Sequence, residues 1–110
     1  MIKHQEFTHV GQNSKLHGNL HFQGKTQLEG AIIGEIHMLY QSPLILGIDS
    51  KVEGKIFCHN LEIYGIIQAD IEATGKVIIY PSADVSGTIK AKSIEVLPGA
   101  EVNMAAHTLT

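Results

Sequence analysis

The stretch Asp49-Ser50-Lys51-Val52-Glu53-Gly54-Lys55-Ile56 contains a pattern that the rest of the chain repeats. A small residue in a turn is followed by an apolar residue, a polar residue, glycine, a second polar residue and a second apolar residue. An internal repeat determines the architecture of a chain, so it is the first feature to interpret. Two close copies occupy residues 13–20 and 82–89, and weaker copies occupy residues 32–36, 67–71 and 99–104.

The spacing of the copies indicates the kind of repeat. Their central residues are separated by 16, 20, 15, 18 and 17 positions, and these residues are Gly18, Gly34, Gly54, Ala69, Gly87 and Met104. A period of about 17 residues is too short for a repeat of two helices and is typical of one turn of a parallel β-helix. Apolar and polar residues alternate within each copy, as in a β-strand with one buried face. We therefore predict an all-β, single-domain solenoid.

Each turn also contains a second, shorter strand. Its inward positions are the pairs Thr26/Leu28, Leu44/Leu46, Leu61/Ile63, Val77/Ile79 and Ile94/Val96. In all five cases the second residue of the pair lies either six or four positions before the first apolar residue of the next copy. The two spacings indicate corners of two lengths. In the shorter corners we expect Gly30 and Gly65 to supply a backbone conformation that other residues avoid. Val10 lies six residues before Leu16, so we expect it to end an incomplete first coil.

Stacking the turns aligns equivalent residues along the solenoid axis. Neighbouring strands lie about 4.8 Å apart, so the same position in successive turns is in contact. Burying a Val, Leu or Ile side chain stabilises a protein by about 1.5–3 kcal/mol. Two buried columns are predicted, Leu16, Ile32, Val52, Ile67, Val85 and Val102 in the first, and Leu20, Ile36, Ile56, Ile71, Ile89 and Ala106 in the second.

Composition excludes several classes of function. The 110 residues carry a net charge of −3, and all eight basic residues are Lys, whereas nucleic-acid binding favours a basic face with Arg. The lone Cys58 cannot form an internal disulfide, which suits a cytoplasmic protein. No apolar run approaches the roughly 20 residues of a membrane span, and the N-terminus lacks the apolar core of a secretory signal. We expect a soluble cytoplasmic protein that binds no nucleic acid.

Motifs for nucleotide or thiol chemistry are incomplete. Gly24-Lys25-Thr26 resembles the end of a phosphate-binding loop, but Asn19 stands where that motif requires its first glycine. Residues from Gln27 onward alternate as a strand and not as the helix that the motif needs. Cys58 lacks an orienting group and is interpreted as a small buried hydrophobe. We predict no nucleotide, no cofactor and no catalytic residue.

The seven histidines raise the question of a metal site. His17 and His21 lie about 13 Å apart on a strand, too far to share one zinc ion. His21 and His37 occupy equivalent positions in successive turns and should stack on one outer face. Two exposed, stacked histidines could bind a metal ion, but we prefer to interpret them as a surface ladder and assign no metal ligand.

Three apolar side chains are expected on the surface. Phe57 should point outward, near Tyr64 and Ile33. The pattern is equally consistent with a contact patch and with scattered single residues.

The repeats resemble those of a known family. Val-Glu-Gly-Lys-Ile at residues 52–56, Val-Ser-Gly-Thr-Ile at 85–89 and Ser-Ile-Glu-Val-Leu-Pro-Gly-Ala-Glu-Val at 93–102 are similar to bactofilin sequences, and the resemblance covers residues 10–102. It implies a right-handed parallel β-helix of about six coils with a triangular section. Residues 1–9 would be a short N-terminal tail and residues 10–110 the β-helix domain.

The resemblance also implies a function. Bactofilins are bacterial cytoskeletal proteins that polymerise end to end without nucleotide into non-polar filaments. They serve cell shape or the spatial organisation of wall synthesis, so cell-wall synthesis or modifying proteins and the inner membrane are expected partners besides the chain itself. An N-terminal membrane contact would use Met1, Ile2 and Phe7. The interface expected at the two ends consists of Phe7, Val10, Leu16, Leu20, Ile94, Val96, Val102, Met104 and Leu109.

The alternative is an enzyme built on a hexapeptide-repeat β-helix. Such acyltransferases and zinc carbonic anhydrases are trimers with His at subunit interfaces, and they repeat every six residues with Gly directly after the apolar residue. Here Gly comes two residues after the apolar residue, and the turns vary from 15 to 20 residues. This difference favours the scaffold over the enzyme.

Overall fold

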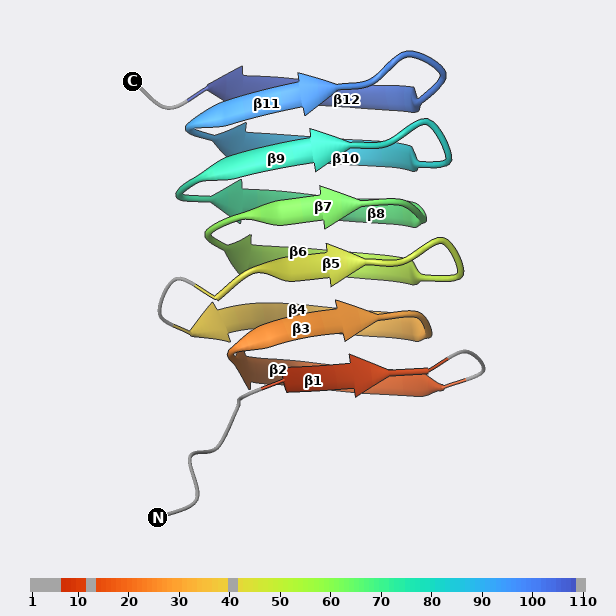
Figure 1. Cartoon of the computed structure of the whole chain (residues 1–110), viewed down its shortest axis with the longest axis vertical. Helices are drawn as coiled ribbons and strands as arrows, with labels where there is room; N and C mark the ends of the chain where they lie inside the picture. The colour runs from red at the N-terminus through yellow and green to blue at the C-terminus, as the bar shows by residue number, and fades with distance from the viewer. Residues whose placement is uncertain (1–6, 12–13, 40–41, 109–110) are drawn as a thin grey trace.

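The computed structural model (Figure 1) describes residues 7–11, 14–39 and 42–108, apart from the side chains of residues 7–10 and 104–108. Within these residues the fold is all-β. Short and long strands alternate along the chain. The strands are β1 (Phe7–Val10), β2 (Lys15–Gln23), β3 (Lys25–Leu28), β4 (Ala31–Leu39), β5 (Leu44–Leu46), β6 (Lys51–Cys58), β7 (Leu61–Ile63), β8 (Ile66–Ala73), β9 (Lys76–Ile79), β10 (Asp84–Ala91), β11 (Ser93–Val96) and β12 (Glu101–Thr108).

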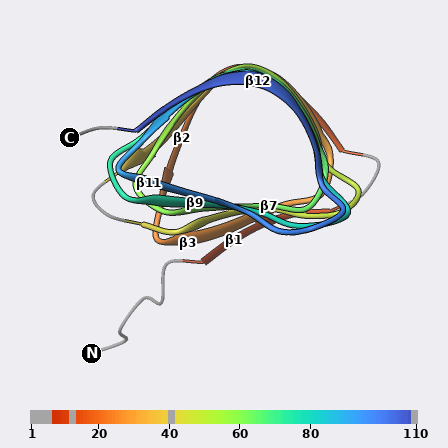
Figure 2. The same ribbon diagram turned by 90° about the horizontal axis from the view of Figure 1, so that it is seen from above.

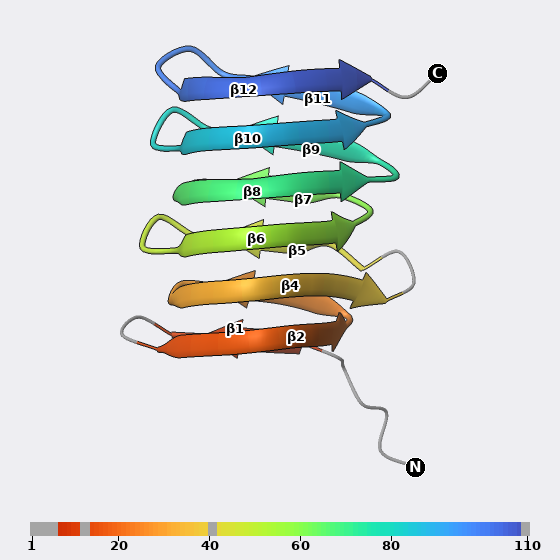
Figure 3. The same cartoon turned by 180° about the vertical axis from the view of Figure 1, so that it is seen from behind.

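The strands form a right-handed parallel solenoid, as expected. The odd-numbered strands make one six-stranded sheet and the even-numbered strands make another. In Figure 1 the short strands run to the right in front, the long strands return to the left behind them, and the chain rises. Figure 3 shows the long strands from the opposite side. The six strand pairs stack as about five complete turns, slightly fewer than the six coils implied by the resemblance.

The cross-section is triangular because each long strand is bent (Figure 2). The short strands form one flat side, and the two arms of the long strands form the others. Each of four long strands contains a central glycine with a positive φ angle: Gly18 at 107°, Gly34 at 138°, Gly54 at 129° and Gly87 at 117°. Residues with a Cβ rarely adopt such positive φ values. A Cβ added at Gly54 would also overlap the carbonyl oxygen of Gly34 in the preceding turn.

The register confirms both predicted columns. Val52 pairs with Ile32 and Ile67, and Ile56 pairs with Ile36 and Ile71, as do the equivalent residues in the other turns. These side chains are essentially inaccessible to solvent in the middle turns.

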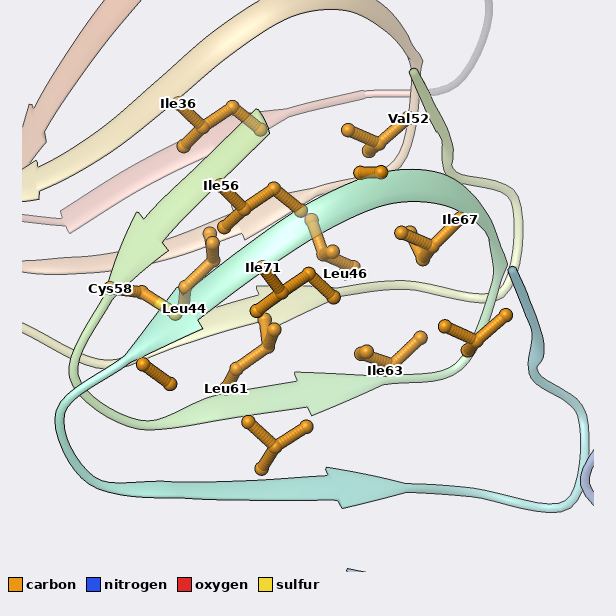
Figure 4. Packing of buried hydrophobic residues seen from close by; sticks show 14 of the residues in the cluster. Ile36, Leu44, Leu46, Val52, Ile56, Cys58, Leu61, Ile63, Ile67 and Ile71 are labelled. Carbon is orange, nitrogen blue, oxygen red and sulfur yellow. The ribbon is translucent and has the colours of Figure 1, made fainter. Parts of the chain in front are cut away.

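Side chains from the short strands complete the interior. In Figure 4 Leu44, Leu46, Leu61 and Ile63 point toward the columns of the long strands. Their pairing follows the predicted inward positions, Leu44 with Leu61 and Leu46 with Ile63. One continuous hydrophobic core therefore fills the solenoid.

The tight corners correct one expectation. The two-residue connections at Gly30 and Gly65 lie where the sequence predicted them, but neither glycine has a positive φ. Close approach of the backbone explains the residue type instead. A Cβ at Gly30 would lie 2.5 Å from the carbonyl oxygen of Ser14, and one at Gly65 would lie 2.5 Å from that of Gly47. The prediction of unusual backbone conformation at these two corners was wrong, and positive φ angles occur instead at the four central glycines and at two other corner glycines, Gly24 and Gly99.

The first coil begins earlier than residue 10. Phe7 pairs with Lys25 in the parallel ladder between β1 and β3, and Val10 pairs with Leu28. The expectation that Val10 ends an incomplete first coil is confirmed. Residues 7–9, which the expected domain boundary places in the N-terminal tail, pair with residues 25–27 of β3.

Two glycine substitutions test the role of the central column. Both Gly18→Ala and Gly54→Ala impose a positive φ on a residue with a Cβ, which destabilises by about 1–3 kcal/mol. Nothing lies within 4 Å of a Cβ at Gly18, whereas a Cβ at Gly54 overlaps backbone. We expect the free energy of unfolding, measured with urea, to fall clearly further for Gly54→Ala than for Gly18→Ala. Equal losses would show that the positive φ, and not the stacking distance, selects glycine.

Candidate functional site

Both ends of the solenoid present strand edges with one neighbour only. Strands β1 and β2 are the outer members of the two sheets at one end, and β11 and β12 at the other. Each such edge carries backbone N–H and C=O groups that the ladder of the described chain does not pair. Proteins normally cover or distort such edges, because an unpaired edge can pair with a strand of another chain.

At the C-terminal end the core columns are uncovered. The Val96 side chain is 48% exposed and Val102 38% exposed, although both continue columns whose preceding members, Ile79 and Val85, are fully buried. Ile94 of β11 is half-buried and packs against the core. Apolar side chains that face inward but lack the next turn would be covered by another copy of the same architecture.

The N-terminal end is similar. Leu16 and Leu20 of β2 are half-buried and pack against the core, while their column neighbours Ile32 and Ile36 are fully buried. Of the other expected interface residues, Phe7 and Val10 lie in β1 and Met104 lies in β12. Their side chains are not described, and Leu109, like the membrane candidates Met1 and Ile2, lies outside the described residues.

The outward charges differ between the two ends. Lys15, His17 and His21 are exposed on β2, the edge strand of the first coil. Glu101 is exposed on β12, and Glu95 on β11 pairs with the Lys76 ammonium at 3.0 Å. The edge strand β2 of the first coil therefore presents the Lys15 ammonium, and the edge strand β12 of the last coil presents the Glu101 carboxylate.

Aromatic rings stack along the outside. The rings of His21 and His37 have centroids 4.7 Å apart at 10°, which confirms that they stack, and Phe57 continues the stack at 4.7 Å from His37. Tyr64 stacks instead on Tyr80, at 4.1 Å. Phe57 and Tyr64 thus belong to separate stacks and not to one contact patch.

The phosphate-loop resemblance at Gly24-Lys25-Thr26 has no counterpart in the structure. Thr26 is fully buried in strand β3, and its hydroxyl donates to the Gly24 carbonyl oxygen at 3.1 Å. The Gly24 N–H donates to the Ser42 hydroxyl at 2.8 Å. These groups hold a corner together, and no helix follows them.

The thiol of Cys58 is placed for packing. The side chain is buried in the core, and burial raises its pKa to about 12, so the thiol is neutral near pH 7. The neighbouring His59 is hydrogen-bonded through Nδ1 to the Thr74 hydroxyl at 2.9 Å. Reactive cysteines have a lowered pKa and access to solvent, so Cys58 lacks both properties.

The described residues contain neither a cluster of metal ligands nor a membrane-spanning helix. No three His, Cys, Asp or Glu side chains there are grouped so that they could hold a metal ion. None of the described segments forms a helix long and apolar enough to span a membrane.

Sequence reasoning missed the polar partner of the tyrosine stack. The Tyr80 hydroxyl donates to the Glu62 carboxylate at 2.9 Å, and hydrogen bonding with Tyr64 and with Glu62 raises the pKa of Tyr80 above its ordinary value. The signal was present, because Tyr64 and Tyr80 each directly follow an inward pair, Leu61/Ile63 and Val77/Ile79. Extending the columns to corner positions would have paired the two tyrosines.

The buried thiol gives a direct prediction. Because the folded-state pKa of Cys58 is about 12 and its side chain is buried, we expect negligible reaction with a disulfide reagent such as DTNB at pH 8 in native protein. In urea-unfolded protein the same thiol should react at the rate of an ordinary cysteine. Rapid native labelling would contradict its placement in the core.

The comparisons with known proteins agree with this architecture. A family model described as "Bactofilin: Polymer-forming cytoskeletal" matches residues 8–106, almost the whole solenoid. Searches of curated proteins and of solved structures found no match. The family match extends from β1 into β12 and so includes both exposed ends. The chain belongs to the bactofilin family of polymer-forming cytoskeletal proteins.

Proposed function

We propose that this protein is a structural scaffold that polymerises end to end through its terminal coils, without nucleotide, into non-polar filaments in the bacterial cytoplasm. The filaments would serve cell shape or the spatial organisation of wall synthesis. The observation that carries the proposal is the exposure of Val96 and Val102, which face inward at an unpaired strand edge. The polymer-forming character of the family supports it.

Each joint would extend both the ladder and the core. Pairing of two edge strands satisfies backbone N–H and C=O groups, and it places the exposed column residues against apolar side chains of the next subunit. Burial of apolar surface is the dominant driving force in association. No energy source is needed, because the contacts resemble those between the turns of one subunit.

The symmetry of the joints determines filament polarity. If first coil meets first coil and last coil meets last coil, each joint is isologous, and their alternation gives a filament without direction. The resemblance to bactofilins supports this arrangement. The competing arrangement joins the last coil to the first, and one observation favours it: continuing the parallel register beyond β12 would place Lys15 of the next subunit beside Glu101.

The scaffold is favoured over the hexapeptide-repeat enzyme. The family is a structural one, and the central glycines lie within the long strands at positive φ, two residues after an apolar residue and not directly after it. The buried Cys58 and the corner at Gly24 add no catalytic group. We therefore assign a non-enzymatic role.

Further contacts are proposed with the inner membrane surface, through Met1, Ile2 and Phe7, and with wall-synthesis or wall-modifying proteins. A short apolar segment alone gives weak and reversible membrane binding. Polymerisation would increase the strength of such contacts by presenting many segments together.

Electron microscopy of purified protein without nucleotide or metal tests the proposal. Six strand pairs at about 4.8 Å each advance about 29 Å per subunit, so a non-polar filament should repeat every roughly 58 Å. A repeat of about 29 Å would instead indicate last-to-first joints. Discrete compact particles would contradict polymerisation and favour the trimeric enzyme.

A charge at an uncovered column position should abolish filaments. In Val102→Asp a carboxylate would be buried at the joint, and burying an unpaired ion costs several kcal/mol. We expect the critical concentration for pelleting to rise about 100-fold or more. The matched control is Asn103→Asp, which adds the same charge at the adjacent exposed position on β12. If folded Val102→Asp pellets like the control, the end-contact proposal is wrong.

Leu20→Arg tests the other end in the same way. The half-buried Leu20 belongs to the edge strand β2, and Asn19→Arg is its exposed control. In a non-polar filament, loss of one kind of joint leaves discrete dimers connected by the other kind. Sedimentation of Leu20→Arg or of Val102→Asp should therefore give dimers, whereas monomers would favour last-to-first joints.

A charge exchange separates the two arrangements independently. Lys15→Glu and Glu101→Lys should restore one another's assembly defect only if Lys15 and Glu101 meet across a joint. For non-polar filaments we expect no such restoration in the double variant, measured by pelleting at low salt, where surface charges are least screened.

A further inference from the structure

Two histidines, His21 and His37, lie side by side on the outer face of the long strands. His21 on β2 and His37 on β4 are register partners, and their rings stack with centroids 4.7 Å apart. His21 is exposed and His37 is half-exposed. The other histidine on the same strand, His17, has Ile33 as its register partner. His17 therefore serves as a control for the pair, because it is a histidine of the same strand that has no histidine as its register partner.

The spacing of the two rings suits a shared metal ion. With metal–nitrogen bonds of about 2.1 Å, two imidazoles bound at angles between 90° and the tetrahedral angle have ring centroids roughly 4.5–5.2 Å apart. The observed 4.7 Å lies within this interval. The rings are parallel within 10°, so binding requires them to tilt. His21 is exposed and can tilt by rotation about its own torsions, whereas any tilt of the half-buried His37 changes its stacking on Phe57.

A carboxylate already orients one of the rings. His37 Nε2 lies 3.1 Å from Glu35 Oε1. A carboxylate oxygen only accepts hydrogen bonds, so Nε2 carries the hydrogen and a neutral ring keeps its lone pair on Nδ1. Metal-binding histidines commonly donate their second N–H to a carboxylate in this way, which fixes the ring and raises its basicity as a ligand.

We propose that His21 and His37 bind one divalent transition-metal ion of the kind that prefers imidazole, namely Ni²⁺, Cu²⁺ or Zn²⁺. Water completes the coordination, because no third His, Cys, Asp or Glu joins a metal-binding group among the described side chains. The site is therefore open and exchangeable. From the sequence alone, a surface ladder was the preferred interpretation of the two histidines and metal binding the alternative.

The position of the pair gives the ion a structural effect. His21 belongs to the edge strand β2, which has a single neighbour, and His37 belongs to that neighbour, β4. A bound ion would cross-link the edge strand β2 to its neighbour β4 and so to the body of the solenoid. Any ligand that binds the folded but not the unfolded state stabilises the fold by mass action. The stabilisation should be greatest at the first coil.

Metal titration tests the site. We expect Ni²⁺, added to the full chain and followed by calorimetry, to bind saturably to wild type. His21→Gln and His37→Gln should each abolish this binding, and Glu35→Gln should weaken it about 10- to 100-fold. His17→Gln is the matched control, since it removes an exposed histidine from the same strand but no pair. Unchanged binding in His21→Gln or His37→Gln, or equal loss in His17→Gln, would overturn the proposal.

Hydrogen exchange supplies a second measurement. Saturating Ni²⁺ should slow amide exchange in β2 of wild type and leave β11 and β12 unchanged, and His37→Gln should remove the effect. Equal protection at both ends, or protection that survives in His37→Gln, would show that the metal acts elsewhere.

Discussion

The in-register parallel ladder is the constraint on which the whole structure depends. Each turn repeats the positions of the previous one at strand spacing, so every side chain has the equivalent side chain of the next turn as its neighbour. Apolar positions therefore become continuous core columns, and outward rings become stacks such as His21, His37 and Phe57. The same spacing excludes a Cβ at Gly54, where it would overlap backbone of the turn before. Core, surface and glycine positions follow from one repeat distance.

Much of this architecture could be predicted because the repeat is visible in the amino-acid sequence. Alternating apolar residues identified the strands, and two consistent spacings aligned the columns that the register confirms. What could not be predicted depends on backbone in the adjacent turn. Whether Gly30 is required by its own φ or by the carbonyl of Ser14 cannot be decided from one strand alone. The separation of Phe57 from Tyr64 likewise depends on which side of the triangle each occupies.

The candidate site was predictable in kind but not in detail. The sequence placed Val102 in a column expected to be buried, and because that column reaches the last turn, Val102 is 38% exposed in the structure, as Val96 is at 48%. The charge difference between the ends emerges only when Lys15 and Glu101 are placed on their edge strands. The proposed scaffold function does not need a pocket or a titrating group. A protein whose turns contact only their neighbours behaves almost as a one-dimensional array, so in the proposed filament assembly between subunits would use the same interactions as folding within a subunit.

The corners carry a separate consequence. Connections between short and long strands contain either two residues, as at Glu29–Gly30, or four, as from Tyr80 to Ala83, yet the columns on either side keep the same register. The additional residues lie outside the ladder and do not shift the faces. Evolution, or an engineer, can therefore lengthen a corner with a peptide tag or a binding loop while the solenoid stays unchanged. In a filament such insertions would be displayed at regular intervals along the axis, at a spacing set by the length of one subunit.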